Sequence, residues 1–341
     1  MKHLGFGILI CAFTSLAQQA NTPRYVPTHQ VTGTIRVWGH GAAGKDYIES
    51  VVRGWEEGFR KVQPGVQFDN ELHGTASAIG ALYTDTGDVA VMGREIWPVE
   101  IEAFRDVKGY APTGVDIVTG SVDIRNKDFA LTFVVNKINP LAHLSLEDVR
   151  RMFSVTARPV RTWGDIGLTG EWSHRPVRLY GFEIARGFGY YLQQRAFGGA
   201  EIWNPDLVEM ADQPREGGGL YDAGQRVVDA VAKDPDGIGF SSALYRSEGV
   251  RVVPLGRAAA GPFLLPTKET VAAHTYPLVQ VITAFYDKQG REAAAVEEFL
   301  RYALSEQGQA VVARDGGYTP MTSALAAREL SKITRNARAP R

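Results

Sequence analysis

One arginine stands among glycines at a point where a helix could begin, in the stretch YGFEIARGFGYYL, residues 180–192. Arg186 directly precedes Gly187 and Phe188, and the aromatic run that follows fits the first turns of a helix. A helix start offers backbone N–H groups and the positive end of the helix dipole, so this stretch could bind an anion. A tight turn that carries a solvated arginine explains the same residues. The stretch by itself leaves both interpretations open.

Motifs typical of catalysis do not occur along the chain. The sequence has no His-x-x-x-His, Gly-x-Ser-x-Gly or Gly-x-x-x-x-Gly-Lys-Ser/Thr motif, and its seven histidines are scattered without metal-ligand spacing. Paired acids such as Glu56 and Glu57 lie in a helical pattern, where a solvated polar face explains them. We therefore expect a protein that is not an enzyme and that has no metal or other cofactor.

The composition is that of a soluble globular protein. The chain has 341 residues, of which 44% are hydrophobic and 22% charged, and 37 basic residues nearly balance 38 acidic ones to give a net charge of -1. This length is enough for two domains. A nucleic-acid-binding protein would show a clustered basic excess, which is missing here. An anionic ligand would have to be attracted by a local site, because the overall charge does not attract it.

The first residues have the pattern of a cleavable export signal, Met1 to Ala17. Lys2 precedes an apolar run that is too short for a comfortable membrane span, and "SLA" places small residues at the cleavage positions. The only cysteine, Cys11, lies inside this run and follows Ile10, whereas a lipoprotein signal would have a small residue there. The expected location is the periplasm, and the mature chain would contain no cysteine.

Further along, strands, glycine-rich turns and helices alternate. Residues 34–38 (TIRVW) predict a strand, 39–44 (GHGAAG) a glycine-rich turn, and the residues from Asp46 a helix with one apolar stripe. Later, Ser145 is the expected N-cap of a helix. This alternation predicts an α/β fold with mainly parallel sheets.

Eight segments in a fixed order carry a family resemblance. They are IRVWGHGAAGKDYIESVVRGWEEGF, HGTASAIGAL, GDVAVMGREIWPVE, LSLEDVRRMFS, WGDIG, KDPDGIGF, YPLVQVITAFYDK and EFLRYALSEQGQAVVARDGGYTPM. Together they resemble the substrate-binding proteins of phosphate ABC transporters, within the periplasmic type II solute-binding family. The resemblance covers nearly the whole mature chain, residues 33–321.

The resemblance implies two α/β lobes joined by two crossing strands, with the ligand in the cleft between them. The crossings are expected near 129–136 and 250–255. Lobe one would then be discontinuous, formed by 33–125 and 254–325, and lobe two would be 128–252. Bending about the crossings would close the cleft over a ligand. The implied ligand is phosphate, and the implied partner is an inner-membrane ABC permease that receives it.

The resemblance also indicates the residues that would bind the ligand. They lie in two loops, at one turn and in the opening stretch: His40, Gly41, Ala42, Thr75, Ala76, Ser77, Arg94, Arg186, Gly187 and Phe188. The family pattern has Arg-Asp where this chain has Phe182-Glu183, and Ser-Gly-Thr where it has Arg186-Gly187-Phe188. Each missing donor would cost about 1–3 kcal/mol of binding. An arginine fork can replace more than one hydroxyl, which is why Arg94 and Arg186 are candidates.

Phosphate is the leading ligand on this basis, although the substitutions predict weaker phosphate binding than is usual in the family. The alternative is a binder or sensor of a different oxyanion or an organic carboxylate, without a dedicated permease. Aromatic residues such as Tyr190 and Tyr191 beside an arginine would suit an organic carboxylate. We expect a monomer.

Overall fold

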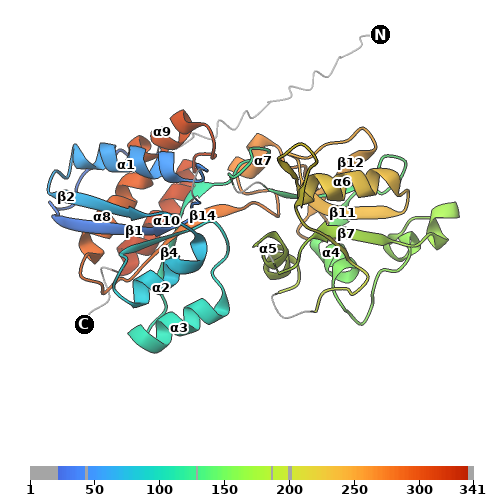
Figure 1. The fold of residues 1–341 in the computed structure, drawn as a ribbon, viewed down its shortest axis with the longest axis horizontal. Coiled ribbons are helices and arrows are strands. Elements are labelled where there is room, and N and C mark those ends of the chain that lie inside the picture. The colour runs from blue at the N-terminus through green and yellow to red at the C-terminus, as the bar shows by residue number, and fades with distance from the viewer. Residues whose placement is uncertain (1–21, 43–44, 128–129, 186, 199–201, 337–341) are drawn as a thin grey trace, which may run out of the picture.

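The computed structural model describes residues 22–42, 45–127, 130–185, 187–198 and 202–336, and these form two α/β lobes side by side (Figure 1). The predicted signal at 1–17 and Arg186 lie outside these ranges. Within the described part of the chain, no helix has both the length and the apolar character needed to cross a membrane.

Lobe one is built around a five-stranded sheet in the order β2-β1-β3-β14-β4. β1 runs parallel to β2 and β3, while β14 is antiparallel to both of its neighbours. The sheet is therefore mixed rather than mainly parallel. The elements of lobe one are β1 (Gly33–Gly39), α1 (Glu49–Arg60), β2 (Val66–Glu71), the 3-10 helix η1 (Thr75–Ser77), α2 (Ala78–Tyr83), β3 (Val89–Met92), α3 (Pro98–Lys108), β4 (Thr113–Thr119), β14 (Val281–Tyr286), α8 (Ala293–Ala303), α9 (Glu306–Asp315) and α10 (Ser323–Asn336).

Helices cover both faces of this sheet. The larger core lies on the side of α1, α8, α9 and α10, where Trp55 and Phe59 of the predicted apolar stripe are fully buried. A smaller core on the other side joins α2 and α3 to β3 through residues such as Phe104. Because β14 lies between β3 and β4, residues from the end of the chain complete the sheet that the first residues begin.

Lobe two has a second five-stranded sheet, in the order β12-β5-β11-β7-β8. β5 is antiparallel to β11 and β12, and β7 is parallel to β11 and β8. Its elements are β5 (Leu131–Asn136), β6 (Leu144–Ser145), α4 (Leu146–Phe153), η2 (Trp163–Ile166), η3 (Gly170–His174), β7 (Arg178–Phe182), α5 (Gly187–Ala196), β8 (Val208–Met210), β9 (Gln213–Pro214), β10 (Leu220–Tyr221), α6 (Ala223–Lys233), β11 (Gly237–Ser242), β12 (Val250–Val253), β13 (Leu255–Gly256) and α7 (Lys268–Ala272).

A local sequence signal explains where α4 begins. The predicted N-cap at Ser145 is confirmed, since its hydroxyl accepts a hydrogen bond from the Asp148 N–H at 3.1 Å. The Asp148 carboxylate in turn accepts from the Ser145 N–H at 2.9 Å, which completes a capping box. Such caps satisfy backbone donors that a helix start leaves without intrahelical partners.

The expected return crossing at 250–255 and the lobe boundary at 254 are wrong. Residues 250–253 form β12, an edge strand of lobe two that pairs with β5, and Leu255, Tyr276 and Leu278 are buried in the core of lobe two. The chain returns only at residues 279–280, immediately before β14, and we call these residues the second crossing segment. The first crossing segment lies between β4 and β5 and comprises the described residues 120–127 and 130; the expected position at 129–136 is wrong, because residues 131–136 form β5 of lobe two. The Gly120 N–H donates to the Gln280 carbonyl at 2.9 Å, so the two crossing segments are hydrogen-bonded to each other.

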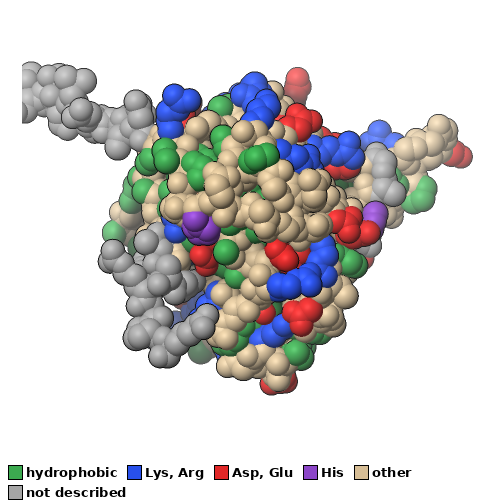
Figure 2. Space-filling model, turned by 90° about the vertical axis from the view of Figure 1, so that its left-hand side faces the viewer, with side chains coloured by type: hydrophobic (Ala, Val, Ile, Leu, Met, Phe, Trp, Pro, Cys, Tyr) green, Lys and Arg blue, Asp and Glu red, His purple; other side chains and the backbone are tan. Residues whose placement is uncertain are grey.

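The surface of lobe one carries both signs of charge. Figure 2 views the molecule from that side and shows Lys and Arg side chains interspersed with Asp and Glu. Mixed charges of this kind are typical of a solvated surface.

Candidate functional site

A cavity of about 680 Å³ lies where the two lobes and the crossing segments meet. Its volume is within the range of about 300–1,000 Å³ that is common for small-molecule sites. Lobe one and the crossing segments provide part of the wall, and β7, α5, the start of α6 and neighbouring loops of lobe two provide the rest. The lining residues are Lys45, Tyr47, Gly93, Arg94, Arg125, Asn126, Phe182, Glu183, Gly187, Phe188, Met210, Asp212, Leu220, Asp222, Ala223, Gly224, Tyr245 and Gln280.

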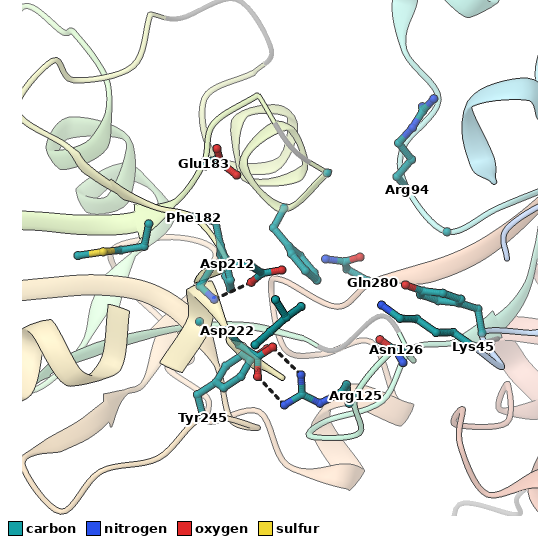
Figure 3. A pocket seen from close by; sticks show the side chains of 18 residues that line it. Lys45, Arg94, Arg125, Asn126, Phe182, Glu183, Asp212, Asp222, Tyr245 and Gln280 are labelled. Carbon is teal, nitrogen blue, oxygen red and sulfur yellow. Dashed lines mark hydrogen bonds and ion pairs between the residues drawn. The ribbon is translucent and has the colours of Figure 1, made fainter. Parts of the chain in front are cut away.

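Charged groups in this wall are partly paired with one another (Figure 3). The Arg125 guanidinium donates to both carboxylate oxygens of Asp222, each at 2.6 Å, and so connects the first crossing segment to the start of α6. Asp212 accepts from the Ala223 N–H at 2.8 Å. Burial, followed by the negative charge of Asp222, raises the pKa of Tyr245 to about 12, so its phenol is protonated at neutral pH.

Arg94 lines the cavity, but its guanidinium is committed within lobe one. It donates to both carboxylate oxygens of Glu100, at 2.7 and 2.8 Å, and to the Glu95 carbonyl at 2.8 Å. It also lies over the Trp97 ring, 4.2 Å from the ring centre. Glu100 caps α3 by accepting from the Trp97 N–H at 2.8 Å. The Arg94 guanidinium, which was expected to bind an anion, therefore stabilises the start of α3.

His40 packs against residues of three loops of lobe one, those that follow β1, β2 and β3. Its ring packs edge-on against Tyr47, with 4.8 Å between the ring centres, and its Nδ1 lies 3.3 Å from the Thr75 hydroxyl. Gly93 lies so close beneath the imidazole that a Cβ there would overlap it. The Gly74 N–H also donates to the Gly39 carbonyl at 2.9 Å. The predicted loops therefore meet, with His40 packed between them.

The other predicted residues have mixed positions. Gly187 and Phe188 begin α5 and line the cavity, so the positive end of the α5 helix dipole faces the site. Gly41 and Ala42 are half-buried, and Ala76 and Ser77 are exposed, but none of these four lines the cavity. Arg186 lies outside the described residues.

Sequence reasoning missed several lining residues, among them Arg125, Asp212, Asp222, Tyr245 and Gln280. No local pattern marks them, because they come from the crossing segments and from separate loops of lobe two. Arg125 and Asp222 are 97 residues apart. Only the folded chain brings them together.

The lobes also touch beside the cavity. The Arg195 guanidinium of α5 donates to Glu95 at 2.7 and 3.0 Å, and Tyr190 packs edge-on against Trp97 with 5.6 Å between ring centres. Glu95 and Trp97 belong to lobe one, whereas α5 belongs to lobe two. These contacts span the two lobes on one side of the site.

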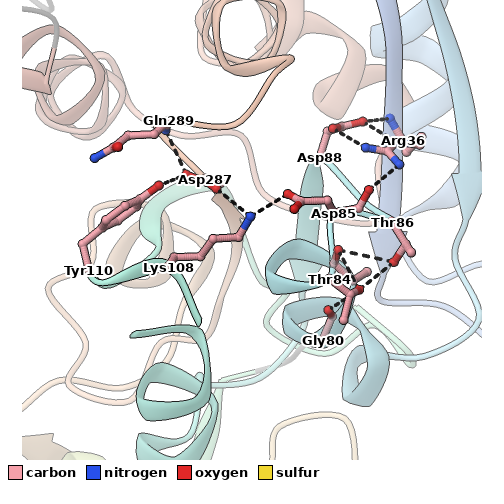
Figure 4. Close-up of polar contacts among 11 residues, drawn as sticks. Arg36, Gly80, Thr84, Asp85, Thr86, Asp88, Lys108, Tyr110, Asp287 and Gln289 are labelled. Atoms are coloured by element: carbon pink, nitrogen blue, oxygen red, sulfur yellow. Dashed lines mark hydrogen bonds and ion pairs between the residues drawn. The ribbon is translucent and has the colours of Figure 1, made fainter. Parts of the chain in front are cut away.

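A second cavity, of about 450 Å³, lies within lobe one at the ends of β3 and β14. Ion pairs occupy much of its wall (Figure 4). Arg36 donates to both oxygens of Asp88 at 2.8 Å, and Lys108 contacts Asp85 at 2.6 Å and Asp287 at 3.4 Å. Because these charges satisfy one another and lie away from the crossing segments, the first cavity is the better candidate.

Comparisons with known proteins agree with this architecture. The family model of the PBP superfamily domain matches residues 40–307. The "Phosphate-binding protein PstS" of Pseudomonas aeruginosa is 29% identical over 319 residues, which cover 91% of this chain and 90% of that protein.

Solved structures show the same two-lobe fold. The crystal structure of an ABC-type phosphate transport receptor from Vibrio cholerae matches with a TM-score of 0.52 and 16% identity, over 84% of this chain and 99% of that one. PstS from Borrelia burgdorferi matches with a TM-score of 0.54 and 12% identity, over 84% and 98%. At these identities the likeness concerns the fold alone.

Proposed function

Because this chain belongs to the PBP superfamily, we propose that it is a periplasmic solute-binding protein that captures phosphate for an ABC permease. The observation that carries the proposal is the cavity at the junction of the lobes, bounded by both crossing segments. Clefts of this kind close over ligands by bending at the hinge. The names of the relatives from Pseudomonas aeruginosa and Vibrio cholerae support phosphate as the ligand.

In this proposal the anion is held at the start of α5 and faces Lys45 across the cavity. The helix dipole end at Gly187 and Phe188 favours a negative charge, and the ammonium of the exposed Lys45 adds a positive one. The lobe-one loops at His40 and Thr75 shape the neighbouring wall. No catalytic step is assigned, and the described residues contain no group of three or more His, Cys, Asp or Glu positioned to hold a metal ion.

A second candidate ligand, a carboxylate-bearing or other oxyanionic solute, is favoured by the composition of the wall. Phe182, Phe188 and Tyr245 supply aromatic surface to the cavity wall. A small, highly charged phosphate ion makes no use of aromatic surface, whereas an organic solute does. In this case the protein would act as a binder or sensor without a dedicated permease.

Calorimetry on the purified mature protein tests the two candidates. Phosphate, sulfate and a panel of small carboxylates are titrated separately at fixed pH and ionic strength. Phosphate binding with micromolar or better affinity, and weaker binding of the others, supports the first candidate. Preference for a carboxylate supports the second, and binding of none of them contradicts the proposed function.

Export is tested separately. The proposed signal predicts that mature protein from the native host begins at Gln18, or at Asn21 if cleavage follows Ala20. N-terminal sequencing of the periplasmic fraction measures this directly. Cytoplasmic protein that retains Met1 would contradict the periplasmic location without affecting the ligand result.

A further inference from the structure

Gln280 lies at the point where the chain returns from lobe two to lobe one. Its carbonyl accepts from the Gly120 N–H of the first crossing segment at 2.9 Å, and two residues earlier the Leu278 carbonyl accepts from the Leu131 N–H at 3.2 Å. The next residue begins β14, which lies between β3 and β4 in the lobe-one sheet. Any bending between the lobes must therefore pass through the backbone around Gln280.

The side-chain amide of Gln280 is buried without a hydrogen-bond partner for its Nε2. The residue is only 6% exposed, and none of the described residues accepts a hydrogen bond from this nitrogen. A buried donor left unpaired costs about 1–3 kcal/mol, so such groups are rare in folded proteins and call for an explanation. Packing alone does not explain it, because an apolar side chain of similar size would fill the space without that cost.

The amide lies at the boundary of two cavities, which indicates a role in ligand binding. Gln280 lines the large interlobe cavity and also a smaller one of about 60 Å³ beneath the contact between Glu95 and Arg195. Figure 3 shows its amide between the lobe-two residues Phe182 and Asp212 and the lobe-one residue Lys45. The unpaired donor therefore belongs to a residue that forms part of the wall of the interlobe cavity.

We propose that Gln280 is a ligand-contacting residue whose Nε2–H group donates to an oxygen of the bound anion. This inference rests on the proposed function and adds a contact that the expected loops and arginines do not provide. The amide is neutral, so it selects an unprotonated oxygen by direction rather than by charge. The contact is made by a hinge residue, so ligand binding and lobe orientation are coupled at one position.

A ligand contact and a purely structural role predict opposite effects on stability. In Gln280→Leu the donor is lost while the volume is nearly kept. If the amide serves the ligand, the unliganded variant is at least as stable as the wild type, because an unpaired buried donor has been removed. Its phosphate affinity falls tenfold to a hundredfold, as expected for one hydrogen bond to a charged group. A structural role would instead lower the stability of the unliganded protein.

Three further variants complete the test, and the first, Gln280→Met, replaces the amide by another apolar side chain of similar length. Gln280→Glu replaces the donor by a charged acceptor and should weaken anion binding more than Gln280→Leu does. Thr132→Val is the matched control, because Thr132 is fully buried in β5, its hydroxyl has no hydrogen-bond partner among the described residues, and it does not line the cavity. The control should be as stable as the wild type or more so, with unchanged phosphate affinity.

The measurements are phosphate calorimetry and urea unfolding of the full mature chain. Weaker binding with undiminished stability in Gln280→Leu, and unchanged binding in Thr132→Val, support the inference. Unchanged binding in Gln280→Leu, or lost stability that Gln280→Met also shows, overturns it and leaves the proposed function standing. If the wild type binds neither phosphate, sulfate nor the carboxylates, the proposed function fails and the inference fails with it.

Discussion

Replacing Arg94 by alanine tests whether this arginine stabilises lobe one or binds the ligand. The guanidinium makes two hydrogen bonds to Glu100, one to the Glu95 carbonyl, and a cation–π contact with Trp97. Both side chains of the ion pair are only 14% exposed. Arg94→Ala therefore removes the partner of a mostly buried carboxylate that also caps α3.

The expected loss follows from these contacts. Two unit charges about 4 Å apart attract by about 4 kcal/mol at an effective dielectric constant near 20, and desolvation cancels part of this. The cation–π contact adds about 0.5–1 kcal/mol. We expect the free energy of unfolding to fall by about 2–3 kcal/mol. Phosphate affinity should change less than about threefold, because both terminal nitrogens of the guanidinium already donate within lobe one.

Urea unfolding and phosphate calorimetry are measured on Arg94→Ala, Glu100→Gln and the double variant. A coupling energy of about 1–2 kcal/mol between the two positions would show that the pair acts as a unit. The reasoning is refuted if Arg94→Ala unfolds like the wild type while its phosphate affinity falls more than tenfold. Arg94 would then be the anion ligand that its place in the sequence suggested.

Three other positions give independent tests by urea unfolding. Burial, followed by the charge of Arg328, lowers the pKa of His274 from 6.5 to about 4. Because the unfolded chain binds this proton more tightly, the free energy of unfolding should fall by at most about 3 kcal/mol as the pH drops from 6.5 to 4. His274→Asn should lack this pH-dependent loss. Gly39 has a φ of 132° and a Cβ there would overlap the Val91 carbonyl oxygen, so Gly39→Ala should cost more than about 2 kcal/mol or prevent folding. Lys108 is 15% exposed between two carboxylates, so Lys108→Met should cost about 1–2 kcal/mol at low salt and less at high salt.

Much of the fold could be read from local patterns. The apolar stripe of α1, the cap at Ser145 and the alternation of strands with helices depend on residues within one or two turns of each other, and these predictions match the structure. The order of the segments likewise indicates the family to which the chain belongs. The loops at His40 and Thr75 were indicated only by the family resemblance; they meet in the structure because they follow β1 and β2, and adjacent parallel strands end at the same sheet edge.

The tertiary structure alone decided the position of the return crossing and the state of the charges in the cavity. Residues 250–253 look like any strand in sequence, and only their pairing with β5 assigns them to lobe two. Arg125 carries the same charge wherever it lies, yet its ion pair with Asp222, 97 residues away, determines whether that charge is available to a ligand. Burial of the Gln280 amide depends on segments more than a hundred residues apart. Periodicity and capping are short-range effects that a sequence displays, whereas pairing and desolvation depend on long-range contacts that only the folded chain creates.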